Sequence, residues 1–142
     1  MKTTILCIIA VIFFLGPPND EWEPDPVEVT ALAQTLYGEC RGCSKLQQKA
    51  VCWCIFNRVD DDRFPDSILE VVSAPLQFQG YSSNNPIWNN LYIVAEQCIM
   101  NWHNDQNRIL DSDMLWFSGY DGINHFRNAW LFEDATKFWE ER

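Results

Sequence analysis

The stretch 36–59 constrains this chain more than any other, because it places one acid between two glycines, ahead of a long apolar segment. Gly38 and Gly42 flank the acid, Glu39. Ser44 follows, with a glutamine three residues later, and this capping box is typical of a helix start. The helix that begins there is apolar on most faces and is therefore predicted to be central in the fold.

A second helix is predicted immediately before this corner. Asp25 offers an N-cap carboxylate, and Pro26 suits the first helical position. An apolar stripe at helical spacing follows, formed by Val29, Leu32, Ala33 and Leu36. Gly38 is the expected stop of this helix. Glu39 is therefore predicted to lie just past the helix end, where the backbone turns.

Two further helices are predicted downstream of the apolar segment. A solvated turn at 60–63 precedes a short helix expected from about Asp66 to Ser73, which ends before a proline. A longer helix is predicted to open at Asn85-Pro86, and its stripe of apolar residues is the cleanest helical period in the chain.

The last third of the chain predicts a small β-structure. Residues 114–117 and 123–127 have strand composition, and they are joined through the glycine-containing segment 119–122, which is a hairpin signal. A charged tail follows, with two expected packing anchors, Phe138 and Trp139. The predicted fold class is mainly α (α+β), a helical domain with a small β-hairpin.

The N-terminal residues do not resemble part of a fold. Lys2 precedes an apolar run at 5–15 that is too short to span a bilayer. Residues 1–19 are therefore predicted to be a secretory signal peptide, with an uncleaved short membrane anchor as the alternative. Either arrangement exports the chain. Residues 20–27 are predicted to form a linker, and residues 28–142 a single domain.

The charge balance excludes one class of partner and restricts another. The net charge is −10, and a nucleic-acid partner is not expected because neutralising phosphates requires a basic face. An acidic chain also gains nothing from general attraction to an anionic surface. Any anionic substrate must therefore be held by a specific groove.

Cysteine usage leaves several interpretations open. With Cys7 in the leader, five cysteines remain, and an odd number argues against a full disulfide framework. Cys52 and Cys54 lie two apart in a predicted helix and point to different sides, so a zinc site is not expected. Cys40 and Cys43 could close a small disulfide or act as a redox pair. Buried or unreactive thiols are the preferred interpretation for the set Cys40, Cys43, Cys52, Cys54 and Cys98.

The candidate for catalysis is an acid. Only His103 and His125 are available as bases for a nucleophile, and neither lies beside one in the sequence. Glu39 is better placed, because a carboxylic acid packed near Tyr37 and Phe78 can donate a proton to a departing glycosidic oxygen. A surface glutamate in a loop is the alternative interpretation.

Several ordered motifs resemble the cell-wall hydrolase family of spore-cortex-lytic enzymes. They are Glu39-Cys40-Arg41-Gly42, Gln48, Ala50-Val51, Asn57-Arg58-Val59, Phe64-Pro65-Asp66, Gln77-Phe78, Leu115-Trp116-Phe117-Ser118-Gly119 and Asn124-His125-Phe126-Arg127-Asn128. The resemblance covers roughly residues 29–130. Their order and compatible spacing make the resemblance far more specific than any single motif.

This resemblance implies a lysozyme-like, mostly helical catalytic domain that cleaves the glycan strands of peptidoglycan. Glu39 falls on the catalytic glutamate of the family. One acid can serve twice in such enzymes, as in lytic transglycosylases, first as acid and then as base. Gln77 falls on a loop that can bind N-acetyl groups of the substrate. The remaining candidates for substrate binding are Phe78, Tyr81, Trp116 and His125.

Two departures from the family pattern weaken the expectation of full activity. Cys43 stands where the family usually has a second glutamate, and Cys40 where it has alanine. The alternative function is therefore a catalytically weakened peptidoglycan-binding or wall-assembly protein that keeps the groove. The resemblance implies no cofactor and no metal. It implies peptidoglycan as the partner, with targeting by the groove or by a wall-targeting partner protein.

Overall fold

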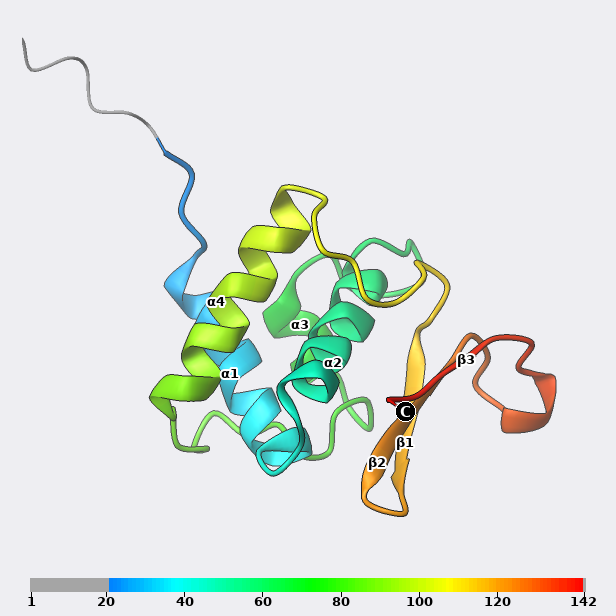
Figure 1. Ribbon diagram of the computed structural model, residues 1–142. Helices are drawn as coiled ribbons and strands as arrows, with labels where there is room; N and C mark the ends of the chain where they lie inside the picture. Colours follow the sequence, from blue (N-terminus) through cyan, green and yellow to red (C-terminus); the bar gives the residue numbers. More distant parts are fainter. Residues whose placement is uncertain (1–20, 142) are drawn as a thin grey trace, which may run out of the picture.

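A group of four helices stands beside a small antiparallel sheet in the computed structural model, which describes residues 21–141 (Figure 1). The helices are α1 (Pro26–Cys40), α2 (Lys45–Val59), α3 (Ile68–Ser73) and α4 (Asn89–His103). The strands are β1 (Trp116–Tyr120), β2 (Ile123–Arg127) and β3 (Phe138–Trp139), in the order β1-β2-β3, with a short 3-10 helix η1 (Phe132–Asp134) before the last. This arrangement confirms the mainly helical α+β class and the predicted hairpin.

Side-chain caps explain where the first helices begin. The Asp25 carboxylate accepts a hydrogen bond from the Val27 N–H at 2.8 Å, so α1 begins at the predicted proline. The Ser44 hydroxyl accepts from the Gln47 N–H at 3.2 Å and starts α2 in the same way. Both predicted helix starts are confirmed because they depend on residues close in sequence.

The predicted end of α1 is wrong. The helix does not stop at Gly38 but continues to Cys40, which puts Glu39 inside its last turn. The reason is a close approach of two backbones: a Cβ built on Gly38 would lie 1.7 Å from the carbonyl oxygen of Gly80. The glycine is required by this packing contact and does not terminate the helix.

The predicted start of α4 is also wrong. The helix begins at Asn89 and not at Asn85-Pro86. The Asn85 amide donates to the Gln34 carbonyl at 2.9 Å and to the Gly80 carbonyl at 2.7 Å. The Gln34 amide returns hydrogen bonds to carbonyls of the same segment. These tertiary bonds hold the chain before Asn89 as an irregular loop.

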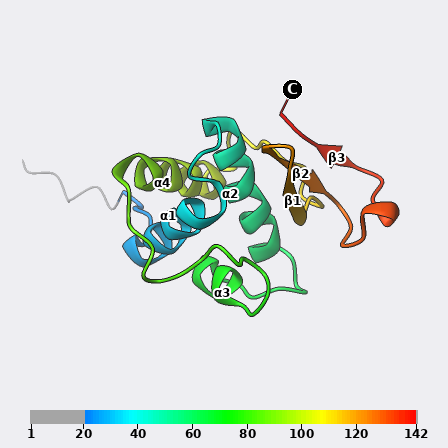
Figure 2. The same ribbon diagram turned by 90° about the horizontal axis from the view of Figure 1, so that it is seen from below.

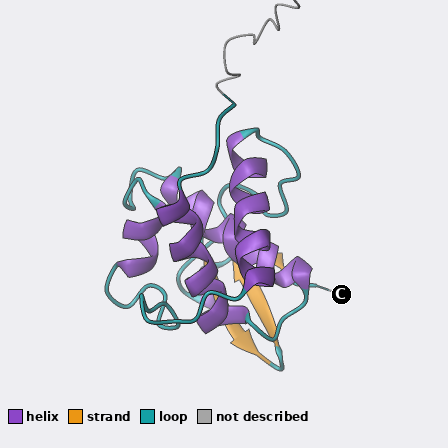
Figure 3. Cartoon of the chain, turned by 90° about the vertical axis from the view of Figure 1, so that its left-hand side faces the viewer, coloured by secondary structure: helices purple, strands orange, loops and turns teal. Residues whose placement is uncertain are grey.

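Helix α2 is the centre of the fold, as predicted. It contacts α1, α3 and α4 as well as β2. Figure 2 shows it between the α1 and α4 pair and the sheet. Figure 3, seen from the helical side, shows the helices in front of the strands. The side chains of α2 from Ala50 to Arg58 are all buried, and the largest are Trp53 and Phe56.

The hairpin is tighter than predicted. Asp121 and Gly122 have positive φ angles of 53° and 80° and form a two-residue turn, so Gly119 and Tyr120 belong to β1. The first strand consequently covers Trp116–Tyr120 and not 114–117. The third strand, β3, pairs with β2 and was not predicted, because a two-residue strand carries no sequence period.

Successive residues of β2 face opposite sides of the sheet. Asn124 and Phe126 are buried against the helices, whereas His125 and Arg127 are only partly buried on the outer face. The tail completes the sheet through Trp139, whose ring packs edge-on to Phe126 at 5.5 Å. Trp139 is the predicted packing anchor, but Phe138 is 51% exposed and is not one.

The predicted signal peptide at 1–19 lies outside the described residues. Within 21–141, no helix is long and apolar enough to cross a membrane. The predicted linker at 20–27 reaches into the described part, and its last two residues, Pro26 and Val27, already belong to α1.

Candidate active site

The Glu39 carboxylate is fixed by a loop that follows α3. Glu39 lies in the last turn of α1, and its Oε1 accepts a hydrogen bond from the Gly80 N–H at 2.7 Å. Gly80 approaches so closely because neither it nor Gly38 has a side chain: a Cβ on Gly80 would lie 2.6 Å from the Gly38 carbonyl carbon. The partly buried carboxylate is therefore held through one oxygen by the Gly80 N–H, at the point where the Gly38 and Gly80 backbones meet.

Arg58 holds the loop that carries Gly80. Its guanidinium extends from α2, donating from Nη1 to Gln77 Oε1 at 2.8 Å and from Nε to the Leu115 carbonyl at 2.7 Å. The same group lies over the rings of Phe78 and Phe64, at 4.9 and 5.2 Å from the centroids. Burial lowers the pKa of Arg58 below its ordinary value. Arg58 therefore connects the helical core, the loop and the start of the sheet.

Asn57 has a matching role on the neighbouring position of α2. This buried amide donates to the carbonyls of Asp111 and Met114, at 2.8 and 3.0 Å. It accepts from Arg108 Nη1 at 2.8 Å. The Asn57-Arg58 pair therefore satisfies the backbone of the segment that leads into β1, and sequence reasoning assigned no role to either residue. The available signal was two polar residues inside an apolar helix.

A disulfide closes the corner after Glu39. Cys40 and Cys43 are bonded, so the preferred interpretation of these two as thiols is wrong. Spacing alone could not decide this, because the helix extends to Cys40 and the following turn brings Cys43 back to it. The Asn124 amide of β2 donates to Cys40 Sγ at 3.2 Å and faces Cys43 Sγ at 3.7 Å. The sheet and the corner are thus tied together.

The other three cysteines in the described range are free and buried, as interpreted: Cys52, Cys54 and Cys98. Burial raises the pKa of Cys54 to about 11 and raises that of Cys52 well above its ordinary value. Neither thiol is a nucleophile in this environment. No group of histidines, cysteines and acids within residues 21–141 could hold a metal ion.

Three of the predicted site residues are Glu39 itself and two residues of the loop that binds it. Gln77 and Phe78 lie in the loop whose Gly80 N–H donates to the Glu39 carboxylate. Phe78 is 5% exposed and packs against Phe117, so its ring supports the loop from behind. Gln77 is exposed. Within residues 21–141 the Glu39 corner therefore combines one anchored acid with one oriented amide.

The other three candidates are Tyr81, Trp116 and His125, and each has contacts with other parts of the structure. Tyr81 lines a hollow on the flank of α1 together with Leu69. Trp116 packs edge-on to Phe64, with ring centroids 6.4 Å apart. His125 follows Asn124 on β2, and because Asn124 points to the corner, His125 points to the opposite face of the sheet.

Comparison with known proteins gives the family. The sequence pattern of the Cell Wall Hydrolase family matches residues 42–139, and the chain belongs to this family. The matched range begins at Gly42, three residues after Glu39. A spore cortex-lytic enzyme from Halalkalibacterium halodurans is 39% identical over 51 residues, which are 36% of this chain and 16% of that protein. No solved structure matches the chain.

Proposed function

We propose that this chain is an exported enzyme that cleaves the glycan strands of peptidoglycan, at the bond between N-acetylmuramic acid and N-acetylglucosamine. The observation that carries the proposal is the carboxylate of Glu39, held through one oxygen by the Gly80 N–H at 2.7 Å. Membership of the cell wall hydrolase family supports a wall polymer as substrate. The similarity to a spore cortex-lytic enzyme supports the same substrate class.

Glu39 would act first as the general acid. Its Oε1 is engaged by Gly80, and Oε2 delivers the proton to the glycosidic oxygen as the bond to the muramic acid C1 breaks. The carboxylate then accepts the proton of the muramic acid 6-hydroxyl while that oxygen bonds to C1. The products are an anhydro-muramoyl end and a new N-acetylglucosamine 4-hydroxyl, and Glu39 regains its proton.

This lytic transglycosylation needs no second carboxylate, and the geometry of the corner suits such a scheme. The position at which the family usually has a second glutamate holds Cys43, whose sulfur is bonded to Cys40. A hydrolase that activates water with a second acid would need another carboxylate at this corner. Cys43 provides none.

Gln77 would orient the substrate through its amide nitrogen. Its Oε1 accepts from Arg58, so the NH₂ group points away from the guanidinium. An exposed NH₂ group held in this way can donate to the carbonyl oxygen of an N-acetyl group. Arg58 would therefore be a positioning residue for substrate binding.

The Cys40–Cys43 disulfide supports export, because disulfides persist in oxidising compartments outside the cytosol. The predicted signal peptide supports the same destination. Detection of the chain with an intact disulfide in the medium or the wall fraction tests this part of the proposal. Recovery of the chain only inside cells would contradict it.

The experiment that tests the activity is digestion of purified wall sacculi by the wild type and by Glu39→Gln, with mass spectrometry of the released fragments. We expect anhydro-muramoyl ends from the wild type and at least a hundredfold less from the variant, consistent with the loss of a general acid. Glu133→Gln, an exposed acid of η1, is the matched control and should retain activity. Release that survives Glu39→Gln would refute the site, and reducing ends in place of anhydro ends would refute the mechanism.

A second candidate function is a peptidoglycan-binding or wall-assembly protein that keeps the groove. The observation that favours it is the disulfide at the position of the family's second acid. In that case the wild type and Glu39→Gln would both cosediment with sacculi, and neither would release glycan.

A further inference from the structure

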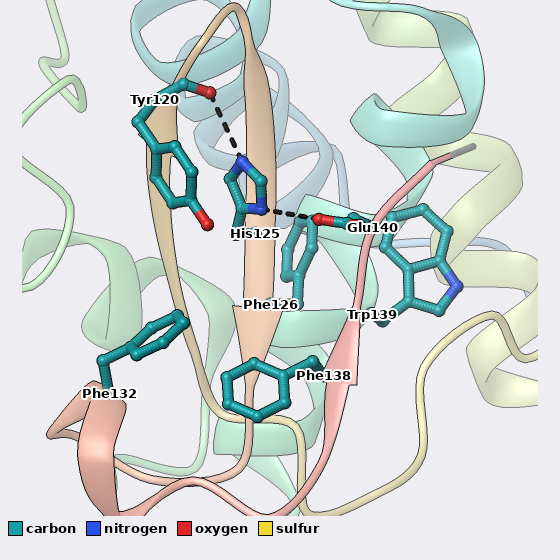
Figure 4. A pocket seen from close by; sticks show the side chains of 7 residues that line it. All are labelled: Tyr120, His125, Phe126, Phe132, Phe138, Trp139 and Glu140. Atoms are coloured by element: carbon teal, nitrogen blue, oxygen red, sulfur yellow. Dashed lines mark hydrogen bonds and ion pairs between the residues drawn. The ribbon is translucent and has the colours of Figure 1, made fainter.

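A hollow of about 380 Å³ lies on the outer face of the sheet, away from the Glu39 corner (Figure 4). The end of β1, the strand β2, the short helix η1 and the tail strand β3 all contribute to it. We call it the tail hollow, and its lining residues are Tyr120, His125, Phe126, Phe132, Phe138, Trp139 and Glu140. Its volume is in the range of pockets that bind small molecules.

Two pairs of flat rings form the walls of the tail hollow. Tyr120 and His125 stack with centroids 3.4 Å apart and planes inclined by 2°. Phe132 and Phe138 form the second pair, with centroids 5.0 Å apart. Figure 4 shows this second pair below the first. Tyr120, Phe132 and Phe138 are 47%, 56% and 51% exposed, so their rings present apolar surface to a ligand.

The polar groups of the tail hollow are already oriented. His125 Nδ1 lies 2.8 Å from Glu140 Oε2, and His125 Nε2 lies 3.4 Å from the Tyr120 carbonyl oxygen. The contact between His125 Nδ1 and Glu140 holds the imidazole in place, so its ring serves as a fixed wall. The second carboxylate oxygen of Glu140 can accept a hydrogen bond from a ligand.

This combination favours a ligand that is flat and apolar on its faces and carries hydrogen-bond donors on its edge. A pyranose ring has C–H groups on its faces, which pack on aromatic rings, and hydroxyl and acetamido N–H donors around its edge. An anionic ligand is disfavoured by Glu140 and by the net charge of −10. A peptide ammonium would be attracted to Glu140, but that carboxylate is paired with His125, and two ring walls suit a plate-shaped ligand better than a point charge.

We propose that the tail hollow binds an N-acetylhexosamine ring of the wall glycan, as a second contact separate from the Glu39 corner. The identity of the glycan rests on the proposed function, whereas binding at the tail hollow requires no cleavage. This contact would let an acidic protein bind the wall through an uncharged sugar ring, without electrostatic attraction. It also gives His125 a role in binding on the outer face of the sheet.

The test uses the Glu39→Gln variant, which removes cleavage, and the neutral probe tetra-N-acetylchitotetraose. The backbone amide signals of the ¹⁵N-labelled protein report where the probe binds. We expect shifts at Tyr120, His125 and Glu140 as the probe is titrated. Adding Phe132→Ala or Phe138→Ala should weaken binding at these signals by about 3- to 10-fold, the effect of losing one ring contact.

Trp130→Ala is the matched control, because this residue is a 65% exposed aromatic of the same tail that does not line the tail hollow. It should leave the affinity unchanged. Both phenylalanine variants remove exposed rings, so unchanged thermal melting checks that they fold. A free wall stem peptide with a terminal ammonium group is the second probe. It should leave the tail-hollow signals unshifted.

The outcomes separate this inference from the proposed function. Shifts confined to Gln77 and Gly80 would overturn the tail-hollow site and leave the Glu39 corner standing. Shifts at the tail hollow that weaken in Phe138→Ala support the inference even if sacculi are never cleaved. A response to the stem peptide but not to the glycan, equal binding by both phenylalanine variants and the control, or no shift at all would each overturn it.

Discussion

Arg58 on α2 donates from Nη1 to the side-chain oxygen of Gln77 at 2.8 Å, and this contact decides which end of the Gln77 amide faces outward. Arg58 is 3% exposed, and its guanidinium also donates to the Leu115 carbonyl. One side chain thus orients a candidate substrate contact and fixes the start of β1.

We expect Arg58→Met to lower the free energy of unfolding by about 3 kcal/mol, because it removes the donors to Gln77 and Leu115 from a buried position. Urea unfolding measures the change. Arg63→Met is the control: Arg63 pairs with Asp61 on the surface, and an exposed pair is worth about 1 kcal/mol or less. Equal losses in the two variants would contradict the structural role of Arg58.

The contact between Gly38 and Gly80 predicts that neither position tolerates a methyl group. Gly80→Ala and Gly38→Ala should each cost about 1–3 kcal/mol of stability, because the added Cβ overlaps backbone that has to shift. Nothing lies within 4 Å of a Cβ built on Gly42, so Gly42→Ala is the matched control and should be close to neutral. Thermal unfolding of the three variants checks this, and a stable Gly80→Ala protein would count against the contact.

The disulfide predicts a stability that depends on reductant. Cys40 and Cys43 are three apart in sequence, and closing so short a loop contributes about 2 kcal/mol by its effect on the unfolded chain. Dithiothreitol should therefore lower the melting temperature of the wild type. The Cys40→Ser and Cys43→Ser double variant should melt lower in the absence of reductant and show no further response to it. A reductant effect that persists in the double variant would place the source elsewhere.

The Asp61–Arg63 pair predicts a small acid-dependent loss of stability. Hydrogen bonds from Arg63 lower the pKa of Asp61 to about 2, from an ordinary value of 3.8. A lowered folded-state pKa stabilises the fold above the unfolded value, and this contribution is lost as the pH falls from about 4 toward 2. Wild type should therefore lose more stability than Asp61→Asn between pH 4 and pH 2 in urea titrations. Asp62→Asn is the control, since the ion pair is made by Asp61, and it should follow the wild-type curve.

Local signals predicted the helix starts, whereas contacts across the chain decided the helix ends. Asp25 and Ser44 cap helices with donors two or three residues away, so sequence alone suffices. The role of Gly38 depends on Gly80, and the late start of α4 depends on Asn85 bonding to α1. Such pairings leave no periodic pattern in either segment.

The residues of the candidate site that lie in sequence motifs could be predicted from the sequence. The side of the sheet on which a strand residue lies could not, because it depends on the register of the strands. The motif resemblance led to Glu39 and to Gln77 and Phe78, which lie in the loop that binds Glu39 through Gly80. His125 lies on the opposite face of β2, because a shift of one residue along a strand reverses the side on which each side chain lies. The two-residue turn at Asp121-Gly122 fixes that register. The sequence predicted a longer connection, from which the register does not follow.

The buried thiols of the helical core make its opening measurable. Cys52 and Cys54 belong to α2 and Cys98 to α4, and all three side chains are buried. Because Cys52 and Cys54 are 0% exposed, a thiol reagent can modify them only after α2 separates from the helices packed on it. The rate of modification therefore reports the frequency of that opening in the native protein, without any introduced label.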